Sequence, residues 1–305
     1  MAVPDFQSFF RPLLEIAGDG KEHSMSEARA IIAKNMKLSE SDLAEMLGSG
    51  KQSKFDNRVA WAKSYFTQAR VLEAPRRGYF KITDRGVQLL KEKHDRIDVK
   101  ILNKFPEFVE FHTAKAEKGA SLESTADNTD TTETPEETLE KSYQSIRNDL
   151  SSAVLAKVKA NTPKFFENLV IDLMISLGYG GSRKDAGKSI GQSGDEGIDG
   201  IIKEDMLGLD VIYIQAKRWE GTVGRPEIQK FVGALHGKRA KKGVFITTGK
   251  FSQDAVSYVE TIDPKVILID GRQLAELMID HNLGVSTSNS YEIKKMDSDY
   301  FDETE

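Results

Sequence analysis

Three residues in the C-terminal half of the chain have the types and the spacing of a hydrolytic site. Asp199 lies in the run Gly-Ile-Asp-Gly-Ile-Ile, and the next apolar run, Val-Ile-Tyr-Ile-Gln-Ala-Lys, contains Gln215 and Lys217. Side chains two residues apart on a strand share a face, so we expect Gln215 and Lys217 to point the same way and Ala216 to point the other. A lysine inside an apolar strand is costly unless it has a partner or a task. A carboxylate, a second oxygen ligand and a lysine at strand ends form a divalent-metal hydrolase site, which makes phosphodiester cleavage the leading hypothesis.

The elements around these residues alternate between strands and helices. Thr162 and Pro163 open a helix in the favoured order of cap and first turn, and Gly178 ends it. We therefore predict an α/β domain with a mixed sheet flanked by helices in three layers. The further elements that we expect are strands near 198–203, 210–218, 244–248 and 266–269, and helices near 226–236, after 252 and at 272–281.

The N-terminal part is predicted to be mostly helical and to end in a β-hairpin. Several helices precede two short apolar runs, 71–74 and 78–82, which flank Pro-Arg-Arg at 75–77. Three helices followed by a basic hairpin is the order of a winged helix-turn-helix. Trp61 and Tyr65 recur at helical spacing, so we interpret them as packed core residues and not as base-stacking ones.

Composition marks the boundary between these parts. Residues 121–140 contain seven acidic residues and no basic one, so this stretch cannot bury enough apolar surface to offset its ordering entropy. We expect 112–138 to be a flexible acidic linker between an N-terminal DNA-recognition domain (1–111) and a nuclease domain (139–285). A lead-in helix at 139–160 opens the second domain, and 286–305 are expected to form a polar tail.

The composition excludes several other classes of protein. The 305 residues include no cysteine, and the five histidines are scattered, so disulfides and thiolate-zinc sites are excluded. No apolar run approaches membrane-spanning length and no apolar leader follows a basic start, so we expect a cytoplasmic protein with no membrane partner. The net charge is −5, yet residues 1–111 carry 19 Lys and Arg against 16 Asp and Glu, which leaves this part locally positive.

Short motifs lie in both halves of the chain. In the C-terminal half they are 165–170 (Phe-Phe-Glu-Asn-Leu-Val), 177–179 (Leu-Gly-Tyr), 194–200 (Gly-Asp-Glu-Gly-Ile-Asp-Gly), 215–218 (Gln-Ala-Lys-Arg) and 245–248 (Phe-Ile-Thr-Thr). In the N-terminal half they are 57–62 (Asn-Arg-Val-Ala-Trp-Ala), 77–78 (Arg-Gly) and 83–86 (Thr-Asp-Arg-Gly). Together these motifs resemble those of the Mrr-type restriction endonucleases. The resemblance implies a restriction-endonuclease-like catalytic domain with the PD-(D/E)xK nuclease fold, in which Gln replaces the usual acid, and a winged helix in the N-terminal half.

The chemistry gives each candidate residue a role. Asp199 is the clearest ligand for Mg²⁺ or Mn²⁺, Gln215 can add an amide oxygen, and the resemblance implies the Ala216 carbonyl as a further ligand. Lys217 would orient or deprotonate the attacking water and offset charge on the phosphoryl oxygens. Glu167 is either a second carboxylate of the site or an exposed glutamate near a helix start, and the sequence favours neither. With Gln in place of an acid, we expect weak metal affinity until DNA is bound.

Basic residues supply candidate DNA contacts. In the N-terminal half the winged-helix order favours phosphate binding by Lys51, Lys54, Arg58, Arg76 and Arg77. A second basic group is either a solvated helix end or a phosphate-binding surface, and the sequence leaves both readings open. This second group consists of Lys238, Arg239, Lys241, Lys242 and Lys250.

Two glycine-rich patterns are not interpreted as sites. Gly187-Lys188-Ser189 resembles the end of a phosphate-binding loop, but Ser182 stands where that loop needs glycine, so we expect no ATP. Residues 185–196 lack the ligand spacing of an EF-hand, and we predict a mobile loop near the active site.

Together these features predict a two-domain, Mg²⁺-dependent DNA endonuclease. The resemblance implies a restriction enzyme that acts on methylated double-stranded DNA. Cutting both strands with one site per chain implies a homo-oligomer. Two alternatives stay open: a nuclease for branched DNA, and a non-catalytic DNA-binding regulator with an idle nuclease fold.

Overall fold

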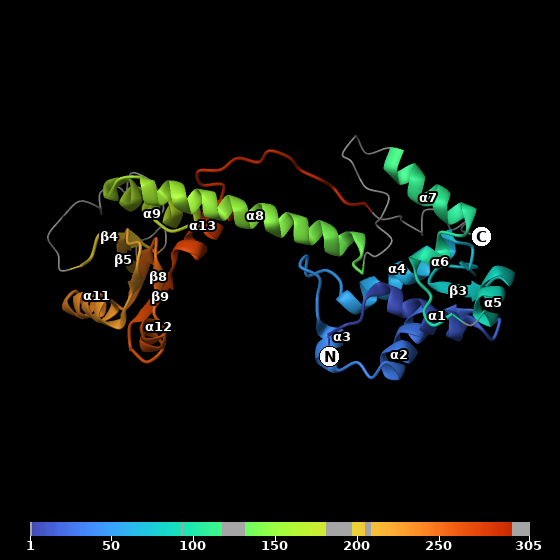
Figure 1. The fold of residues 1–305 in the computed structure, drawn as a ribbon. Coiled ribbons are helices and arrows are strands. Elements are labelled where there is room, and N and C mark those ends of the chain that lie inside the picture. The colour runs from blue at the N-terminus through green and yellow to red at the C-terminus, as the bar shows by residue number, and fades with distance from the viewer. Residues whose placement is uncertain (1, 93, 118–131, 181–196, 205–208, 295–305) are drawn as a thin grey trace. The chain divides into compact units, whose positions relative to one another are not determined.

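The computed structural model describes residues 2–92, 94–117, 132–180, 197–204 and 209–294. The chain forms two compact units, the first running to Gln144 and the second from Ser145 to Lys294. Each unit has its own hydrophobic core. The 26-residue helix α8 (Pro135–Ala160) begins in the first unit and ends in the second (Figure 1).

The first unit is mainly helical, as predicted. Four of its helices start where serine or threonine side chains accept hydrogen bonds from backbone N–H groups of the first turn, at Ser24, Ser39, Ser53 and Thr83. Its helical elements are the 3-10 helix η1 (Phe6–Phe9), α1 (Phe10–Ala17), α2 (Met25–Asn35), α3 (Glu40–Ala44), α4 (Lys54–Gln68), α5 (Asp84–Lys91), α6 (Val99–Leu102) and α7 (Pro106–Glu117).

Three short strands complete this unit. β1 (His23–Ser24), β2 (Leu72–Glu73) and β3 (Tyr79–Ile82) form an antiparallel sheet in the order β1-β3-β2. The predicted hairpin is therefore confirmed as β2 and β3, with Leu72 opposite Ile82. At its tip the guanidinium of Arg76 lies 3.7 Å above the ring of Tyr79.

The core of the first unit is aromatic. Phe6 and Phe10 pack edge-on against each other, with 5.7 Å between ring centroids, and both contact Tyr65. Tyr65 is buried, which confirms its interpretation as a core residue. Trp61 is only partly buried, and its ring nitrogen donates a hydrogen bond to Glu136 at the start of α8.

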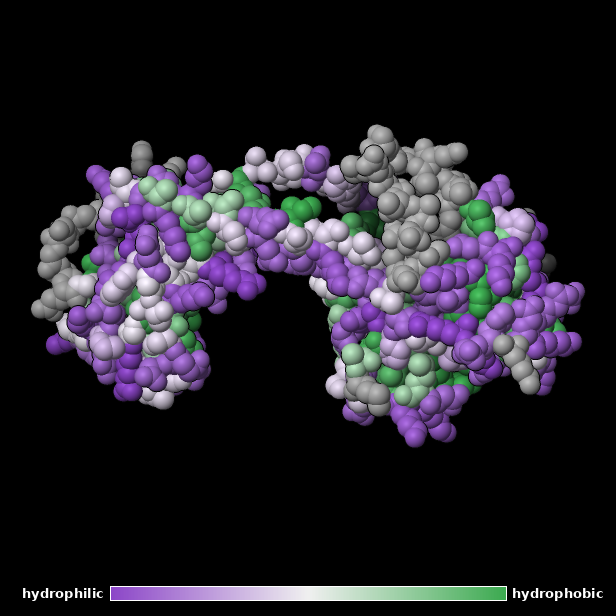
Figure 2. All heavy atoms as spheres, in the orientation of Figure 1, coloured by the Kyte–Doolittle hydropathy of each residue, from purple (hydrophilic) through white to green (hydrophobic). Residues whose placement is uncertain are grey.

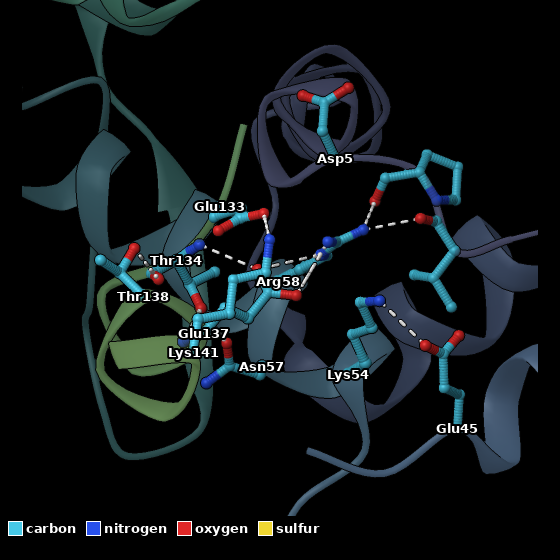
Figure 3. A network of polar contacts seen from close by, with 12 residues as sticks. Asp5, Glu45, Lys54, Asn57, Arg58, Glu133, Thr134, Glu137, Thr138 and Lys141 are labelled. Atoms are coloured by element: carbon cyan, nitrogen blue, oxygen red, sulfur yellow. Dashed lines mark hydrogen bonds and ion pairs between the residues drawn. The ribbon is translucent and has the colours of Figure 1, made fainter. Parts of the chain in front are cut away.

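A buried polar network joins the start of α8 to helix α4 (Figure 3). Arg58, only 8% exposed, donates to the backbone oxygens of Val3 (2.6 Å) and Pro4 (2.7 Å) and pairs with the carboxylate of Glu137 at 2.8 Å. Glu137 is 6% exposed, and its second oxygen accepts the N–H of Thr134 at 2.9 Å. The guanidinium is thus surrounded by acceptors, which is how a buried charge is tolerated.

This network shows where helix α8 begins. The hydroxyl of Thr134 accepts the N–H of Glu137 while the Glu137 carboxylate accepts the N–H of Thr134, which is the reciprocal pattern of a capping box. The helix therefore starts at Pro135, four residues before the expected position, and α7 extends to Glu117. Both ends of the expected 112–138 linker are helical, and 118–131 lie outside the described residues.

The second unit contains the predicted mixed sheet. Its four strands are β4 (Gly200–Lys203), β5 (Val211–Lys217), β7 (Lys242–Thr247) and β9 (Lys265–Ile269), in the order β4-β5-β7-β9. β4 pairs antiparallel with β5, whereas β5, β7 and β9 are parallel. A separate parallel pair is formed by β6 (Thr222–Val223) and β8 (Lys250–Phe251).

Helices cover both faces of this sheet (Figure 1). One face packs on α9 (Pro163–Ser176), α13 (Gly271–Asp280) and the end of α8, through residues such as Ile214, Ile246 and Phe166. The other face packs on α11 (Arg225–Gly237) and α12 (Gln253–Val259), through residues such as Tyr213, Phe245 and Phe231. Neighbouring residues of β5 and β7 thus alternate between two cores, as a three-layer arrangement requires.

Hydrophilic residues dominate the face shown in Figure 2, and hydrophobic residues appear there as smaller patches. Residues 286–294 have no helix or strand, and 295–305 of the expected tail lie outside the described residues. Among the helices of the described residues, none is long and apolar enough to span a membrane.

Breaking the Arg58 network should destabilise the first unit. We expect Arg58→Ala to lower the free energy of unfolding of this unit by about 3–5 kcal/mol, because it leaves the Glu137 carboxylate buried without its cation. Lys54→Ala, which breaks the more exposed pair with Glu45, should cost about 1 kcal/mol or less. The protein has two tryptophans, so in a Trp219→Phe background the fluorescence of Trp61 reports on this unit alone. Unfolding by guanidinium chloride, followed by this fluorescence, measures the loss of stability. Equal losses for both variants would contradict the prediction.

Candidate active site

Asp199 stands immediately before β4 and is fixed to β5 by three hydrogen bonds. Its N–H donates to the Ile214 oxygen at 2.8 Å. Its Oδ2 accepts the side-chain amide of Gln215 at 2.7 Å and the N–H of Ala216 at 2.8 Å. The other carboxylate oxygen, Oδ1, has no hydrogen-bond partner within the part of the chain that the structure describes. The carboxylate is therefore held in place with one oxygen left for a ligand.

Burial and the neighbouring polar groups shift the pKa of Asp199 in opposite directions. Burial raises the pKa of the Asp199 carboxyl, since a charged group loses hydration there. The N–H of Ala216, the amide of Gln215 and the charge of Lys217 lower the same pKa, but burial is the stronger influence. A carboxylate that is costly to keep charged gains most from a cation placed beside it.

Glu167 on α9 lies near the same carboxylate. It is partly buried and lines a small cavity together with Asp199, Gly200 and Ala216. The remaining wall consists of Val170, Ile171 and Ile214. Of the two readings that the sequence left open, this placement favours Glu167 as a second carboxylate of the site.

Lys217 ends β5 and has a partner that sequence analysis did not identify. Its ammonium contacts the carboxylate of Glu227, in the first turn of α11, and lies 4.3 Å from the centroid of the Trp219 ring. Glu227 also accepts a hydrogen bond from Lys230 at 2.9 Å. Both interactions, that with Lys217 first, lower the pKa of Glu227, so it is a carboxylate at neutral pH. A glutamate directly after the proline that opens a helix was the available signal.

Gln215 uses its amide nitrogen toward Asp199, while its Oε1 faces Gly197. Gly197 has φ of +100°, and a Cβ there would lie 3.1 Å from Oε1, so both its conformation and its lack of a side chain suit this contact. Rotation of the amide about its last bond exchanges the oxygen and the nitrogen. That rotation would turn an oxygen ligand toward Asp199.

The donor set fits a hard divalent cation held weakly. Carboxylate, amide and carbonyl oxygens are the ligands that Mg²⁺ and Mn²⁺ accept. No cluster of three or more His, Cys, Asp or Glu occurs among the described residues, and two carboxylate side chains, those of Glu167 and Asp199, line the cavity. A cation held by these groups would need further oxygen ligands, such as a phosphate oxygen, to complete its coordination. The glycine-rich stretch expected near the site, 185–196, lies outside the described residues, as do Ser182 and Gly187–Lys188–Ser189.

The basic residues of the first unit that were predicted to contact DNA are either exposed, at least in part, or buried. Lys51, Arg76 and Arg77 are exposed, and the partly exposed Lys54 pairs with Glu45 at 2.9 Å. The expectation that Arg58 contacts phosphate needs correction, because this guanidinium is buried and bound to Glu137 and to two backbone oxygens. In the second unit Lys242 pairs with Glu204 and with Asp210 (2.9 Å), which raises its pKa and gives it a structural partner.

The chain also matches models of known protein families. A family model described as a restriction endonuclease matches residues 158–278, which contain all the residues of the candidate active site. A model of the Mrr N-terminal domain matches residues 6–92. These matches place the chain in the class of restriction endonucleases.

A relative that matches along its whole length narrows the class. The type IV methyl-directed restriction enzyme EcoKMrr of Escherichia coli (strain K12) is 34% identical over 308 residues, covering 99% of this chain and 100% of that protein. The chain belongs to the Mrr family of restriction endonucleases, and it is a DNA restriction nuclease.

Solved structures show weaker likenesses. The modification-dependent restriction endonuclease AspBHI is 17% identical, with a TM-score of 0.35, and the match covers 70% of this chain but only 56% of that one. The restriction endonuclease FokI bound to DNA is 11% identical, with a TM-score of 0.31 and coverage of 91% and 70%. Both scores are below 0.5, so neither likeness bears on the function of this chain.

The Gln215–Asp199 contact leads to a prediction about metal binding. Gln215→Glu replaces a hydrogen-bond donor with a second negative charge beside Asp199, so without metal we expect the variant to lose about 1–3 kcal/mol of stability. With Mg²⁺ or Mn²⁺ the added charged ligand should restore stability and strengthen binding at least about tenfold. Calorimetric titration and thermal unfolding with and without metal measure both effects. Gln253→Glu, an exposed change on α12, is the matched control, and equal behaviour of the two variants would exclude Gln215 from the metal site.

Proposed function

We propose that this protein is a divalent-metal-dependent endonuclease that cuts methylated double-stranded DNA. The observation that carries the proposal is the fixed Asp199 carboxylate, bound to Gln215 and Ala216 and sharing a cavity with Glu167. Membership of the Mrr family supports the restriction activity, and the methyl-directed relative from Escherichia coli supports the choice of substrate.

In this proposal the second unit supplies both the ligands of the cation and the catalytic lysine. Asp199 and Glu167, with the amide oxygen of Gln215 and the carbonyl of Ala216, would bind Mg²⁺ or Mn²⁺. When bound, the cation supplies Lewis acidity and increases the acidity of a coordinated water. The ammonium of Lys217 orients the attacking water and offsets the negative charge that builds up on the phosphoryl oxygens.

The first unit would select the DNA. We assign it as a winged-helix recognition domain, covering about 1–111, because helices α2, α3 and α4 precede the β2–β3 hairpin. Lys51, Lys54, Arg76 and Arg77 would bind phosphates there. The nuclease domain, about 139–285, would act in a homo-oligomer, because cutting two strands requires two such sites. ATP has no role in this scheme.

Asp199→Ala should abolish cleavage and leave DNA binding intact. Loss of the central carboxylate should lower the cleavage rate by more than about 10³-fold, whereas the binding energy comes mainly from phosphate contacts elsewhere. We would compare wild type and variant with Mg²⁺ on methylated plasmid, unmethylated plasmid and branched DNA, and measure binding by gel shift. Asp263→Ala, in an exposed loop, is the control.

Each outcome of that experiment has a clear meaning. Cleavage of methylated plasmid alone by the wild type supports the proposal. Cleavage of branched DNA alone identifies a structure-selective nuclease, and tight binding without cleavage identifies a DNA-binding regulator. Near wild-type cleavage by Asp199→Ala would remove this residue from the site.

Changes at the hairpin tip should affect affinity and not chemistry. The double variant Arg76→Ala/Arg77→Ala should bind DNA more weakly and should reduce the slope of log affinity against log salt by about 2. Its cleavage rate at saturating DNA should stay within about twofold of wild type. Arg11→Ala, on α1 of the same unit, is the control because Arg11 lies outside the hairpin and, like Arg76 with Glu22, is paired with a glutamate, Glu15. An unchanged salt slope in the double variant would argue against recognition through the hairpin.

A further inference from the structure

The catalytic lysine candidate lies between a carboxylate and an aromatic ring. The Lys217 side chain is 33% exposed, so solvent reaches it from one side. On its other sides the ammonium contacts the Glu227 carboxylate and lies 4.3 Å from the centroid of the Trp219 ring. A lysine side chain has four rotatable bonds and a charge that water would otherwise hydrate freely. These two neighbours restrict where that charge can lie.

Glu227 is attached to a rigid part of the second unit. It belongs to the first turn of α11, where its N–H donates to the Gly224 oxygen at 3.1 Å. Ile228, the next residue, is fully buried, as are other α11 side chains that pack against the sheet. Lys230, one turn further along, binds the carboxylate oxygen that Lys217 does not use. The carboxylate therefore has a fixed position relative to the end of β5.

The fold does not need this ion pair to hold the end of β5 in place. Lys217 pairs with Thr247 in the parallel β5–β7 ladder, and the Thr247 hydroxyl donates to the Lys217 backbone oxygen at 2.9 Å. A partly exposed ion pair adds little to stability because water screens it. The Lys217–Glu227 ion pair instead determines the position of the Lys217 ammonium. That ammonium is near enough to Asp199 to lower the pKa of the Asp199 carboxyl.

The neighbouring residue on the same face of β5 cannot supply this charge. Gln215 lies two positions before Lys217, so the two side chains share a face, but Gln215 is neutral and its amide nitrogen is bound to Asp199. Glu227 is the carboxylate that contacts the lysine, and it comes from a helix on that face of the sheet.

We propose that Glu227 is a positioning residue that holds the Lys217 ammonium at the site of phosphodiester cleavage and supplies the negative charge that Gln215 lacks. This inference rests on the proposed nuclease function. Glu227 acts through Lys217 and has no contact with DNA in this scheme. Removing its charge should therefore slow the cleavage step without weakening the binding of DNA.

The test is single-turnover cleavage of methylated plasmid by the full-length protein with Mg²⁺. We expect Glu227→Gln to lower the maximal rate by about 10–100-fold, since a misplaced catalytic group costs a factor of this size. DNA affinity should stay within about twofold of wild type, and the midpoint of thermal unfolding should not change. Glu227→Asp, which keeps the charge on a shorter side chain, should recover part of the lost rate. In a Lys217→Ala background, Glu227→Gln should have no further effect.

Glu276→Gln is the matched control, because Glu276 forms an ion pair with Arg272 on α13 and undergoes the same loss of charge. It should cleave at the wild-type rate. A wild-type rate for Glu227→Gln, or its failure to fold, would overturn the assignment, since the first denies a role in cleavage and the second shows a structural role. A wild-type protein that binds DNA without cutting it would instead overturn the proposed function. Those two failures are therefore distinguishable.

Discussion

The candidate active site depends on the antiparallel register between β4 and β5. Gly200 lies opposite Ile214, and the N–H of Asp199 donates to the Ile214 oxygen, so the Asp199 carboxylate reaches the N–H of Ala216. A slip of one residue would turn every side chain of β5 to the opposite face and separate the carboxylate from Gln215. The alternation of Ile212, Tyr213 and Ile214 between two hydrophobic cores opposes such a slip.

The same alternation explains why the site draws on helices from both faces of the sheet. Ile214 and Ala216 belong to the face covered by α9, so that helix brings Glu167 to the cavity beside Asp199. Tyr213 belongs to the face covered by α11, and residues 215 and 217 follow it at the period of a strand. Lys217 therefore meets its carboxylate partner on α11, while the cavity carboxylates lie toward α9. The end of β5 is where the two sets approach each other.

In the first unit the charged side chain of Arg58 has a structural role. Arg58 stands in a sequence of basic residues that are otherwise exposed or partly exposed, and nothing in its immediate neighbours marks it as buried. Its guanidinium instead bridges the N-terminal backbone at Val3 and Pro4 and the carboxylate of Glu137. That arrangement attaches the beginning of α8 to α4, and it withdraws one cation from the set that could contact DNA. A buried arginine with several acceptors is costly to break even where it adds little net stability.

The sequence alone was sufficient for the features that neighbouring residues encode. The order of helices and strands, the cap at Thr162, and the grouping of Asp199 with Gln215 could be predicted, because periodicity, caps and short motifs act within a few residues. The signal for the start of α8 is also local, since Thr134 and Glu137 have capping-box spacing. The acidic composition of the surrounding stretch favoured a linker there instead. The tertiary structure decided which distant charges meet. Glu167 lines a cavity with Asp199, and Glu227 and Glu137 form ion pairs with Lys217 and Arg58, only because packing brings separate elements together. The energy of an ion pair depends on the distance between its charges and on their burial, and sequence spacing determines neither.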